Sequence, residues 1–233
     1  MEIIDTFSIP GFREPVSCLT HLLAVPIFAI LGYSLVRRSK NWGHAVSLAA
    51  MVVCTVFLLS MSGVYHLLGP GSGRAVMRQL DIAGVFALIA GTVTPVHSIL
   101  FRGFNRWVPL LWIWSAAATG ITLRTIFSNS LPPEVAFTIF LIMGWGGLST
   151  CAVLERRYGF WFIRPLLWGG LAYTLGVIVL SFDWPTLIPG VVGAHELWHL
   201  AVLFGLSQHW KFVFRFASGP PERSVPMPER FNA

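Results

Sequence analysis

Serine, histidine and aspartate side chains interrupt the long apolar stretches of this sequence at five positions: Ser62, His66, Asp81, His195 and His199. Ionisable groups inside apolar segments are costly in lipid and usually mark a functional site. Three histidines can hold a tetrahedral zinc ion and leave its fourth position open for water, which is the catalytic form of a zinc site. The residue types therefore predict a metal centre held by the three histidines, with Asp81 and Ser62 hydrogen-bonded to the water.

The spacing of these residues favours a shared site over separate roles. Ser62 and His66 are four residues apart, as are His195 and His199, so each pair lies on one face of a helix. Each residue also has a simpler explanation. A single His-x-x-x-His pair is a weak signal, His66 could be an interfacial histidine, and Asp81 could cap a helix or pair with an arginine. Ser62 could bond to its own helix.

The elements that would position these residues are membrane helices. The chain has 233 residues, of which 55% are hydrophobic and 11% are charged, whereas soluble domains carry about 25% charged residues. We predict an all-α polytopic fold with one seven-helix transmembrane domain over residues 1–216 and a disordered, proline-rich polar tail over 217–233. The predicted spans cover about 17–36, 43–67, 79–101, 107–127, 134–154, 163–182 and 190–214.

Alternation of the seven spans puts the five polar residues at one depth. The second span ends, and the third and seventh begin, on the side of the N-terminus. His21 begins the first span on the same side, so we expect it to support the site or gate the substrate. Glu196 points off the face shared by the two histidines around it. The remaining histidines belong to the opposite side, too far away to bind the same ion: His44, His97 and His209.

The distribution of basic residues predicts the orientation. The net charge is +6, but the basic residues are spaced along loops without aromatic residues between them, which argues against nucleic-acid binding. Twelve of the sixteen lie on the side of the C-terminus. Because basic residues mark the cytoplasmic side, we expect a cytoplasmic C-terminus and an external N-terminus. The four on the N-terminal side are Arg13, Arg74, Arg78 and Arg124.

Cysteines and tryptophans have expected structural roles. Cys18, Cys54 and Cys151 lie inside apolar segments, without the spacing of a disulfide framework or a zinc knuckle, and are expected to be small core residues. Several tryptophans lie near span ends and are expected to anchor the helices at the headgroup level: Trp42, Trp107, Trp161, Trp184 and Trp210.

Three stretches of the sequence resemble the haemolysin III group of the progestin and adipoQ receptor family. They are SMSGVYH (60–66), RQLDIAGVFALIAGTVTP (78–95) and HELWHL (195–200), with a weaker match in EPVSCLTH (14–21). The wider superfamily includes adiponectin receptors and alkaline ceramidases. The resemblance implies a zinc ion held by His66, His195 and His199, with Asp81 and Ser62 near its water. Adiponectin receptors place this site in the cytoplasm, whereas the charges here predict an external site, as in the ceramidases.

These observations predict a zinc-dependent intramembrane hydrolase that acts on an amide or ester bond of a lipid. Asp81 would accept the proton of the water, and Ser62 would help to stabilise the oxyanion. A role in lipid homeostasis in a bacterial plasma membrane is expected. The alternative is a non-catalytic membrane sensor or receptor-like regulator in which zinc is structural and lipid is a ligand. A transporter is disfavoured, because the middles of the spans carry few polar groups.

Overall fold

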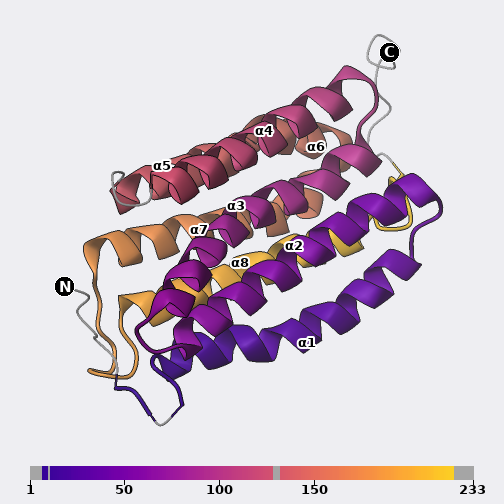
Figure 1. The fold of residues 1–233 in the computed structure, drawn as a ribbon. Helices are drawn as coiled ribbons and strands as arrows, with labels where there is room; N and C mark the ends of the chain where they lie inside the picture. The colour runs from indigo at the N-terminus through magenta and orange to yellow at the C-terminus, as the bar shows by residue number, and fades with distance from the viewer. Residues whose placement is uncertain (1–6, 10, 128–131, 223–233) are drawn as a thin grey trace.

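The computed structural model describes residues 7–9, 11–127 and 132–222, and these form a bundle of helices (Figure 1). The only extended pairing in this part of the chain consists of two isolated bridges. The helices are α1 (Pro15–Arg37), α2 (Trp42–Leu67), α3 (Ser72–Leu100), α4 (Phe104–Ile126), α5 (Pro133–Trp145), α6 (Leu148–Tyr158), α7 (Phe160–Phe182) and α8 (Ala194–Phe214).

Helices α5 and α6 continue one another. The Gly146 amide donates to the Ile142 carbonyl at 2.9 Å, and the Cys151 amide donates to the Gly147 carbonyl at 2.9 Å, so the helical path crosses the two glycines. Within the described residues, the eight segments therefore make seven rods.

Five of the rods are long and apolar enough to cross a membrane: α1, α2, α3, the α5–α6 rod and α7. The predicted all-α fold is therefore confirmed in the described residues, with helices that are long and apolar enough to span a membrane at five of the seven predicted positions. Helix α8 is not among these five. Its first turns carry His195, Glu196 and His199, and these polar residues lower its hydropathy.

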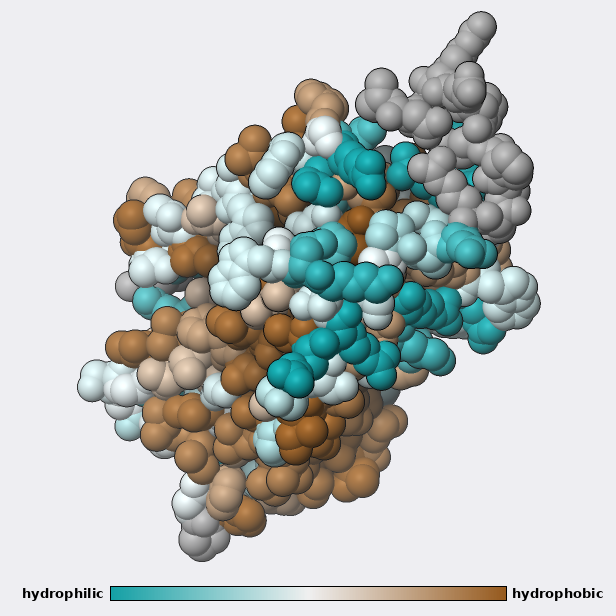
Figure 2. All heavy atoms as spheres, turned by 90° about the vertical axis from the view of Figure 1, so that its right-hand side faces the viewer, coloured by the Kyte–Doolittle hydropathy of each residue, from teal (hydrophilic) through white to brown (hydrophobic). Residues whose placement is uncertain are grey.

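The outer faces of the bundle carry apolar side chains, as lipid requires. Along α1, Leu23 is 64% exposed, Ile27 is 56% exposed and Ile30 is 71% exposed. Hydrophilic residues instead gather at one end of the bundle, which Figure 2 views directly. An apolar belt that ends in a polar cap is the surface expected of an integral membrane protein.

Glycines allow α3 to pack closely against α2. A Cβ atom added at Gly84 would lie 2.9 Å from the Cα atom of Leu58, and one added at Gly91 would lie 2.7 Å from the Cβ atom of Cys54. Larger residues at either position would force the helices apart. This close contact holds α3, which carries Asp81, against α2, which carries two of the predicted site residues.

Among the helix boundaries that differ from the prediction, two helix starts affect the candidate site. Helix α3 begins at Ser72 instead of residue 79, because its first two turns are polar and do not register as an apolar span. Asp81 therefore lies inside α3 and does not cap it. Helix α8 begins at Ala194 instead of residue 190, because the apolar segment before it forms a turn in which the Ile188 and Val192 backbones pair.

Four of the five tryptophans that were expected at the membrane interface are exposed, and one is buried. Trp42, Trp107, Trp161 and Trp184 are at least 60% exposed. Trp210 was expected at the interface but is 2% exposed, and its indole N–H donates to the Thr55 hydroxyl at 3.2 Å. A hydroxyl inside the bundle thus provides the hydrogen bond that an indole otherwise finds among headgroups.

The three cysteines lie where the sequence predicts them, whereas the predicted tail begins with a buried residue. Cys18 and Cys54 are buried, Cys151 is half-buried, and all three are free thiols, as expected of small core residues. Ala217, where the predicted tail begins, is buried. Residues 223–233, the greater part of the predicted disordered tail, lie outside the described residues.

Candidate metal centre

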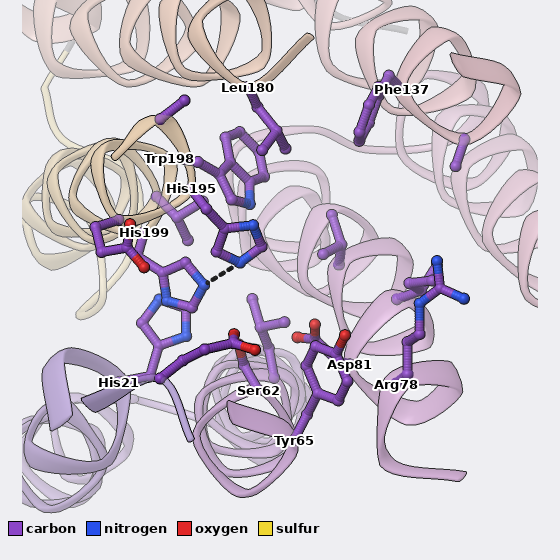
Figure 3. Close-up of a pocket in the computed structure, with 18 of the residues that line it drawn as sticks. His21, Ser62, Tyr65, Arg78, Asp81, Phe137, Leu180, His195, Trp198 and His199 are labelled. Carbon is purple, nitrogen blue, oxygen red and sulfur yellow. Dashed lines mark hydrogen bonds between the residues drawn. The ribbon is translucent and has the colours of Figure 1, made fainter. Parts of the chain in front are cut away.

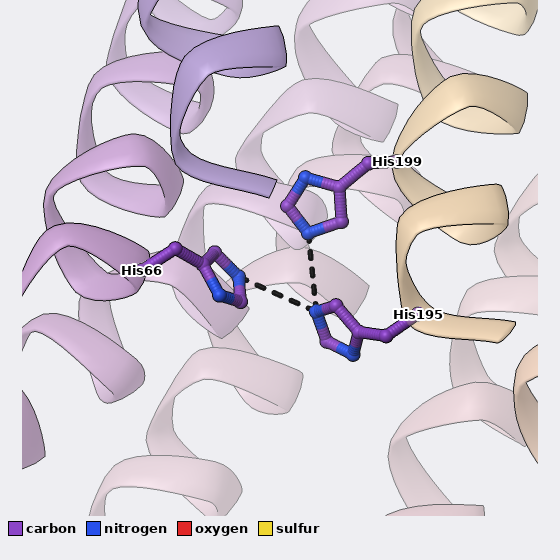
Figure 4. Close-up of side chains that lie close together, drawn as sticks. All are labelled: His66, His195 and His199. Atoms are coloured by element: carbon purple, nitrogen blue, oxygen red, sulfur yellow. Dashed lines mark hydrogen bonds between the residues drawn. The ribbon is translucent and has the colours of Figure 1, made fainter. Parts of the chain in front are cut away.

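Three histidines meet at the end of the bundle where α2 ends and α8 begins (Figure 4). The Nε2 atom of His195 lies 3.4 Å from that of His66 and 3.1 Å from that of His199. The candidate ligand atoms of all three residues lie within 4.8 Å of one another. His66 and His199 are buried, and His195 is the more accessible of the three.

The spacing of these nitrogen atoms fits a metal ion. Two nitrogens that each lie 2.0–2.1 Å from one ion at a tetrahedral angle are about 3.3 Å apart. The separations of 3.4 Å and 3.1 Å bracket that distance. Three imidazoles are also a donor set that suits zinc and other borderline cations. The three histidines could therefore hold a metal ion with little movement.

Glu14 fixes the orientation of His66. Its carboxylate accepts a hydrogen bond from His66 Nδ1, and the backbone amide of Glu14 donates to the His66 carbonyl at 3.1 Å. A proton on Nδ1 leaves the lone pair of Nε2 directed at the other two histidines. A carboxylate behind a histidine in this way is the usual support of a metal-ligating imidazole.

Arg74 holds the same carboxylate from the other side. Its guanidinium donates to Glu14 at 2.5 Å and to the carbonyls of Tyr65 and Leu68 at 2.8 Å and 2.9 Å. Burial raises the pKa of Glu14, but the hydrogen bond and charge of His66, together with Arg74, outweigh it and lower the pKa to about 2. Glu14 is therefore ionised at neutral pH.

A second carboxylate joins α1 to α8. Glu196 is 2% exposed; it accepts a hydrogen bond from the Ser17 hydroxyl at 2.8 Å and caps α8 by accepting one from the Gly193 amide at 3.0 Å. His21, one turn further along α1, packs against His199 with ring centroids 4.0 Å apart and ring planes tilted by 30°. The first turns of α1 thus contact both helices that carry the histidines, and His21 lies beside the site as expected.

Ser62 and Asp81 lie on the open side of the histidines (Figure 3). Ser62 and Asp81 are close enough to each other to interact, and Asp81 is also close to His66. Ser62 lies one helical turn before His66 on α2, whereas Asp81 comes from α3. The structure thus brings all five predicted residues together, although they come from three helices.

These residues adjoin a pocket of about 500 Å³ that is lined by Ser62, Asp81, His195 and His199. A second cavity of about 190 Å³ shares Leu58, Val85, Phe140, Trp198 and Val202 with the first and has a largely apolar lining. The two together offer a polar chamber beside the histidines and an apolar extension into the bundle.

Glu14 and Arg74 are the site residues that the sequence did not reveal. Both lie close to the ends of predicted spans, where Arg74 was used only to assign the orientation in the membrane and Glu14 was not singled out. Glu14 begins the weaker stretch EPVSCLTH, which was the one available signal. Its contact with His66 joins residues 52 positions apart, a separation at which helical spacing carries no information.

Comparison with known proteins finds a matching family model and several similar sequences. The model of the family described as "Haemolysin-III related" matches residues 11–210. Hemolysin-3 of Bacillus cereus is 30% identical over 200 residues, covering 83% of this chain and 86% of that protein. A Hemolysin-3 homolog of Bacillus subtilis (strain 168) is 25% identical over 200 residues, covering 83% of this chain and 89% of that protein. An uncharacterised protein of Schizosaccharomyces pombe is 25% identical over 227 residues, covering 88% of this chain and 51% of that protein.

Proposed function

The chain belongs to the haemolysin III-related family, and from that premise we propose that it is a zinc-dependent intramembrane hydrolase of a lipid amide or ester. The observation that carries the proposal is the convergence of three histidine Nε2 atoms beside a pocket that is also lined by Ser62 and Asp81. Three protein ligands next to an open chamber is the arrangement of catalytic zinc sites, whereas structural sites are closed by four.

In this proposal His66, His195 and His199 hold the ion. Zinc supplies Lewis acidity, which acidifies a water molecule and polarises the carbonyl oxygen of the substrate. Asp81 accepts the proton that the attacking water loses as its oxygen bonds to the acyl carbon. Asp81 then delivers that proton to the nitrogen or oxygen that leaves when the C–N or C–O bond breaks. Ser62 keeps the Asp81 carboxylate oriented and has a hydroxyl to offer the developing oxyanion.

The two cavities suit a lipid substrate. The polar chamber next to Asp81 would take the reacting bond, and the apolar cavity would take an acyl chain. Gly144 and Gly170 line that cavity and have no heavy atom within 4 Å of the position of an added Cβ, so they contribute to its width.

We also propose that α4 and α8 span the membrane with the other five rods, and that the C-terminus is cytoplasmic. Single cysteines at Ser72 and Ser218, in a variant without the three native cysteines, test this orientation in intact cells. A membrane-impermeant thiol reagent should label position 72 and not position 218. The opposite pattern would invert the orientation and put the histidines near the cytoplasm.

The function itself is tested by comparing Asp81→Asn with His66→Ala in detergent-purified protein. Asp81→Asn should keep zinc, measured by elemental analysis, and lower lipid hydrolysis by about 10²–10⁴-fold, because it removes the proton acceptor. His66→Ala should lose zinc and hydrolysis together. Zinc-loaded protein that cleaves no amide or ester in a broad lipid screen would sink the proposal in favour of a structural zinc site in a membrane sensor.

A further inference from the structure

The loop between α7 and α8 exposes several large apolar side chains. Residues 183–193 connect the two helices at the end of the bundle that holds the histidines. Trp184 is 72% exposed and Leu187 is 60% exposed, and Ile188 and Val191 are exposed as well. Contiguous apolar surface of this kind is unfavourable in water and usually marks contact with a membrane or a partner.

The segment before α1 extends the same surface (Figure 1). The Phe7 amide donates to the Gly190 carbonyl at 2.5 Å, and the Phe7 ring fills the space that a side chain at position 190 would need. Phe7 and Ile9 are both exposed. The exposed apolar residues of the two segments together form what we call the apolar patch: Phe7, Ile9, Trp184, Leu187, Ile188 and Val191.

The apolar patch continues the lipid-facing surface of α7. Leu175, Ile178 and Phe182 are exposed, and their spacing places them on one face of α7 that leads into the loop. The loop itself has no basic residue, and its one acidic residue, Asp183, lines the pocket beside the histidines. That pocket lets the Asp183 carboxylate meet water while the rest of the loop contacts lipid. Continuity with a lipid-covered face favours lipid over a second protein at the patch.

Most of the loop backbone is hydrogen-bonded within the protein. The amides of Leu187 and Ile188 donate to the Val192 carbonyl at 2.9 Å and 3.1 Å. Two residues of the loop are prolines, and seven of the other nine donate their amide to a described residue: Asp183, Trp184, Leu187, Ile188, Val191, Val192 and Gly193. A backbone polar group that meets lipid needs a partner within the protein or in water. The loop therefore suits a depth at which water is scarce.

We propose that the apolar patch lies at the boundary between the headgroups and the acyl chains of the adjacent leaflet, where phospholipid covers it. Trp184 suits this depth, because an indole ring combines an apolar body with a polar N–H group. Burial of the apolar side chains in lipid holds such an element at the membrane surface. The inference goes beyond the proposed hydrolysis and does not depend on it.

The depth of the loop also sets where the pocket opens. Ser181, Asp183 and Gly193 line the pocket, and they lie at the two ends of the loop. A loop embedded in the leaflet brings this part of the pocket to the depth of the lipid headgroups. A lipid can then reach the pocket from the bilayer without crossing water.

Spin labels on the loop test its depth. Leu187→Cys and Ile188→Cys are made singly in the variant without native cysteines, labelled with a nitroxide and reconstituted in vesicles of phosphatidylcholine and phosphatidylglycerol. Oxygen concentrates in lipid, whereas a water-soluble nickel chelate stays outside it, so the ratio of the two accessibilities reports depth. Leu23→Cys, on the exposed face of α1, is the lipid reference, and Lys40→Cys, in the α1–α2 loop, is the water reference. The ratio at positions 187 and 188 should exceed that at 40 and approach that at 23.

Two results would overturn the inference. A ratio at positions 187 and 188 equal to that at position 40 would put the loop in water. Low accessibility to both reagents, with dipolar broadening that disappears when labelled protein is diluted with unlabelled protein, would assign the patch to a second copy of the chain instead of phospholipid.

Wild-type protein gives an independent measurement that needs no substitution. A photoactivated carbene reagent confined to the lipid of the same vesicles should modify residues 183–193 as well as the exposed face of α1, and peptide mass spectrometry locates the products. Modification of α1 without modification of the loop would also overturn the inference. Neither measurement uses zinc or turnover. A protein that hydrolyses nothing can therefore pass both tests, and an active hydrolase can fail them.

Discussion

Two buried histidines at different places in the bundle use their ring nitrogens differently. His97 contacts the Asn105 carbonyl through Nδ1 at 2.9 Å and the Thr150 hydroxyl through Nε2 at 3.2 Å, so protein groups occupy both of its nitrogens. His66 gives Nδ1 to Glu14, whereas its Nε2 atom faces only other imidazoles. Burial is alike, at 4% and 1% exposed. The second nitrogen therefore separates His66, a candidate metal ligand, from His97, whose two nitrogens both contact protein groups.

The largest expected effect comes from exchanging the two kinds of histidine for alanine. His199→Ala removes a nitrogen from the cluster and should abolish stoichiometric zinc binding. His97→Ala should leave zinc binding intact and lower only thermal stability, because its two hydrogen bonds are structural. Elemental analysis and thermal unfolding of both variants check this. Retention of zinc by His199→Ala would break the distinction between the two sites.

The sequence predicted the cluster itself because its information is local. Spacing by four residues places His195 and His199 on one helix face, and alternation of the spans brings His66 to the same end. It could not predict Glu14, whose partner comes from another helix and whose carboxylate resembles any acid in a leader segment. The start of α3 was missed for a related reason. Hydropathy marks where lipid contact begins, and a helix can extend beyond that point into polar surroundings, as it does before Asp81.

A smaller effect is expected from the carboxylate behind His66. Glu14→Gln should weaken zinc affinity by about 10–100-fold, because the amide no longer accepts the Nδ1 proton as a charged partner. Glu196→Gln is the matched control, since that carboxylate also joins α1 to the bundle but contacts Ser17 and Gly193 instead of a ring nitrogen. It should lower stability more than affinity. Competition with a chelator measures the zinc affinity of both variants. Equal losses of affinity would show that Glu14 supports the site only by joining α1 to the bundle.

The smallest expected effect is the response of zinc content and stability to acid, which should occur in two steps. Imidazoles bind metal only when neutral, so zinc should be released as acid protonates the three histidines. The pKa of Glu14 is lowered from 4.5 to about 2. The stability that its ionised form provides is therefore full above about pH 4.5 and lost as the pH falls from there toward 2. Zinc content and unfolding temperature, followed together, should separate the steps. Zinc content that is unchanged down to strongly acidic pH would contradict ligation by the three histidines.

The hydrogen bond between Ser17 and Glu196 joins residues that are 179 positions apart, at the two ends of the helical region. During synthesis, α1 enters the membrane long before α8 exists. Until the ribosome has supplied residue 196, the Ser17 hydroxyl lacks the buried partner that it has in the finished protein, and the histidine cluster has one member of three. A chain released early therefore exposes polar groups to lipid at the very place where the complete chain buries them.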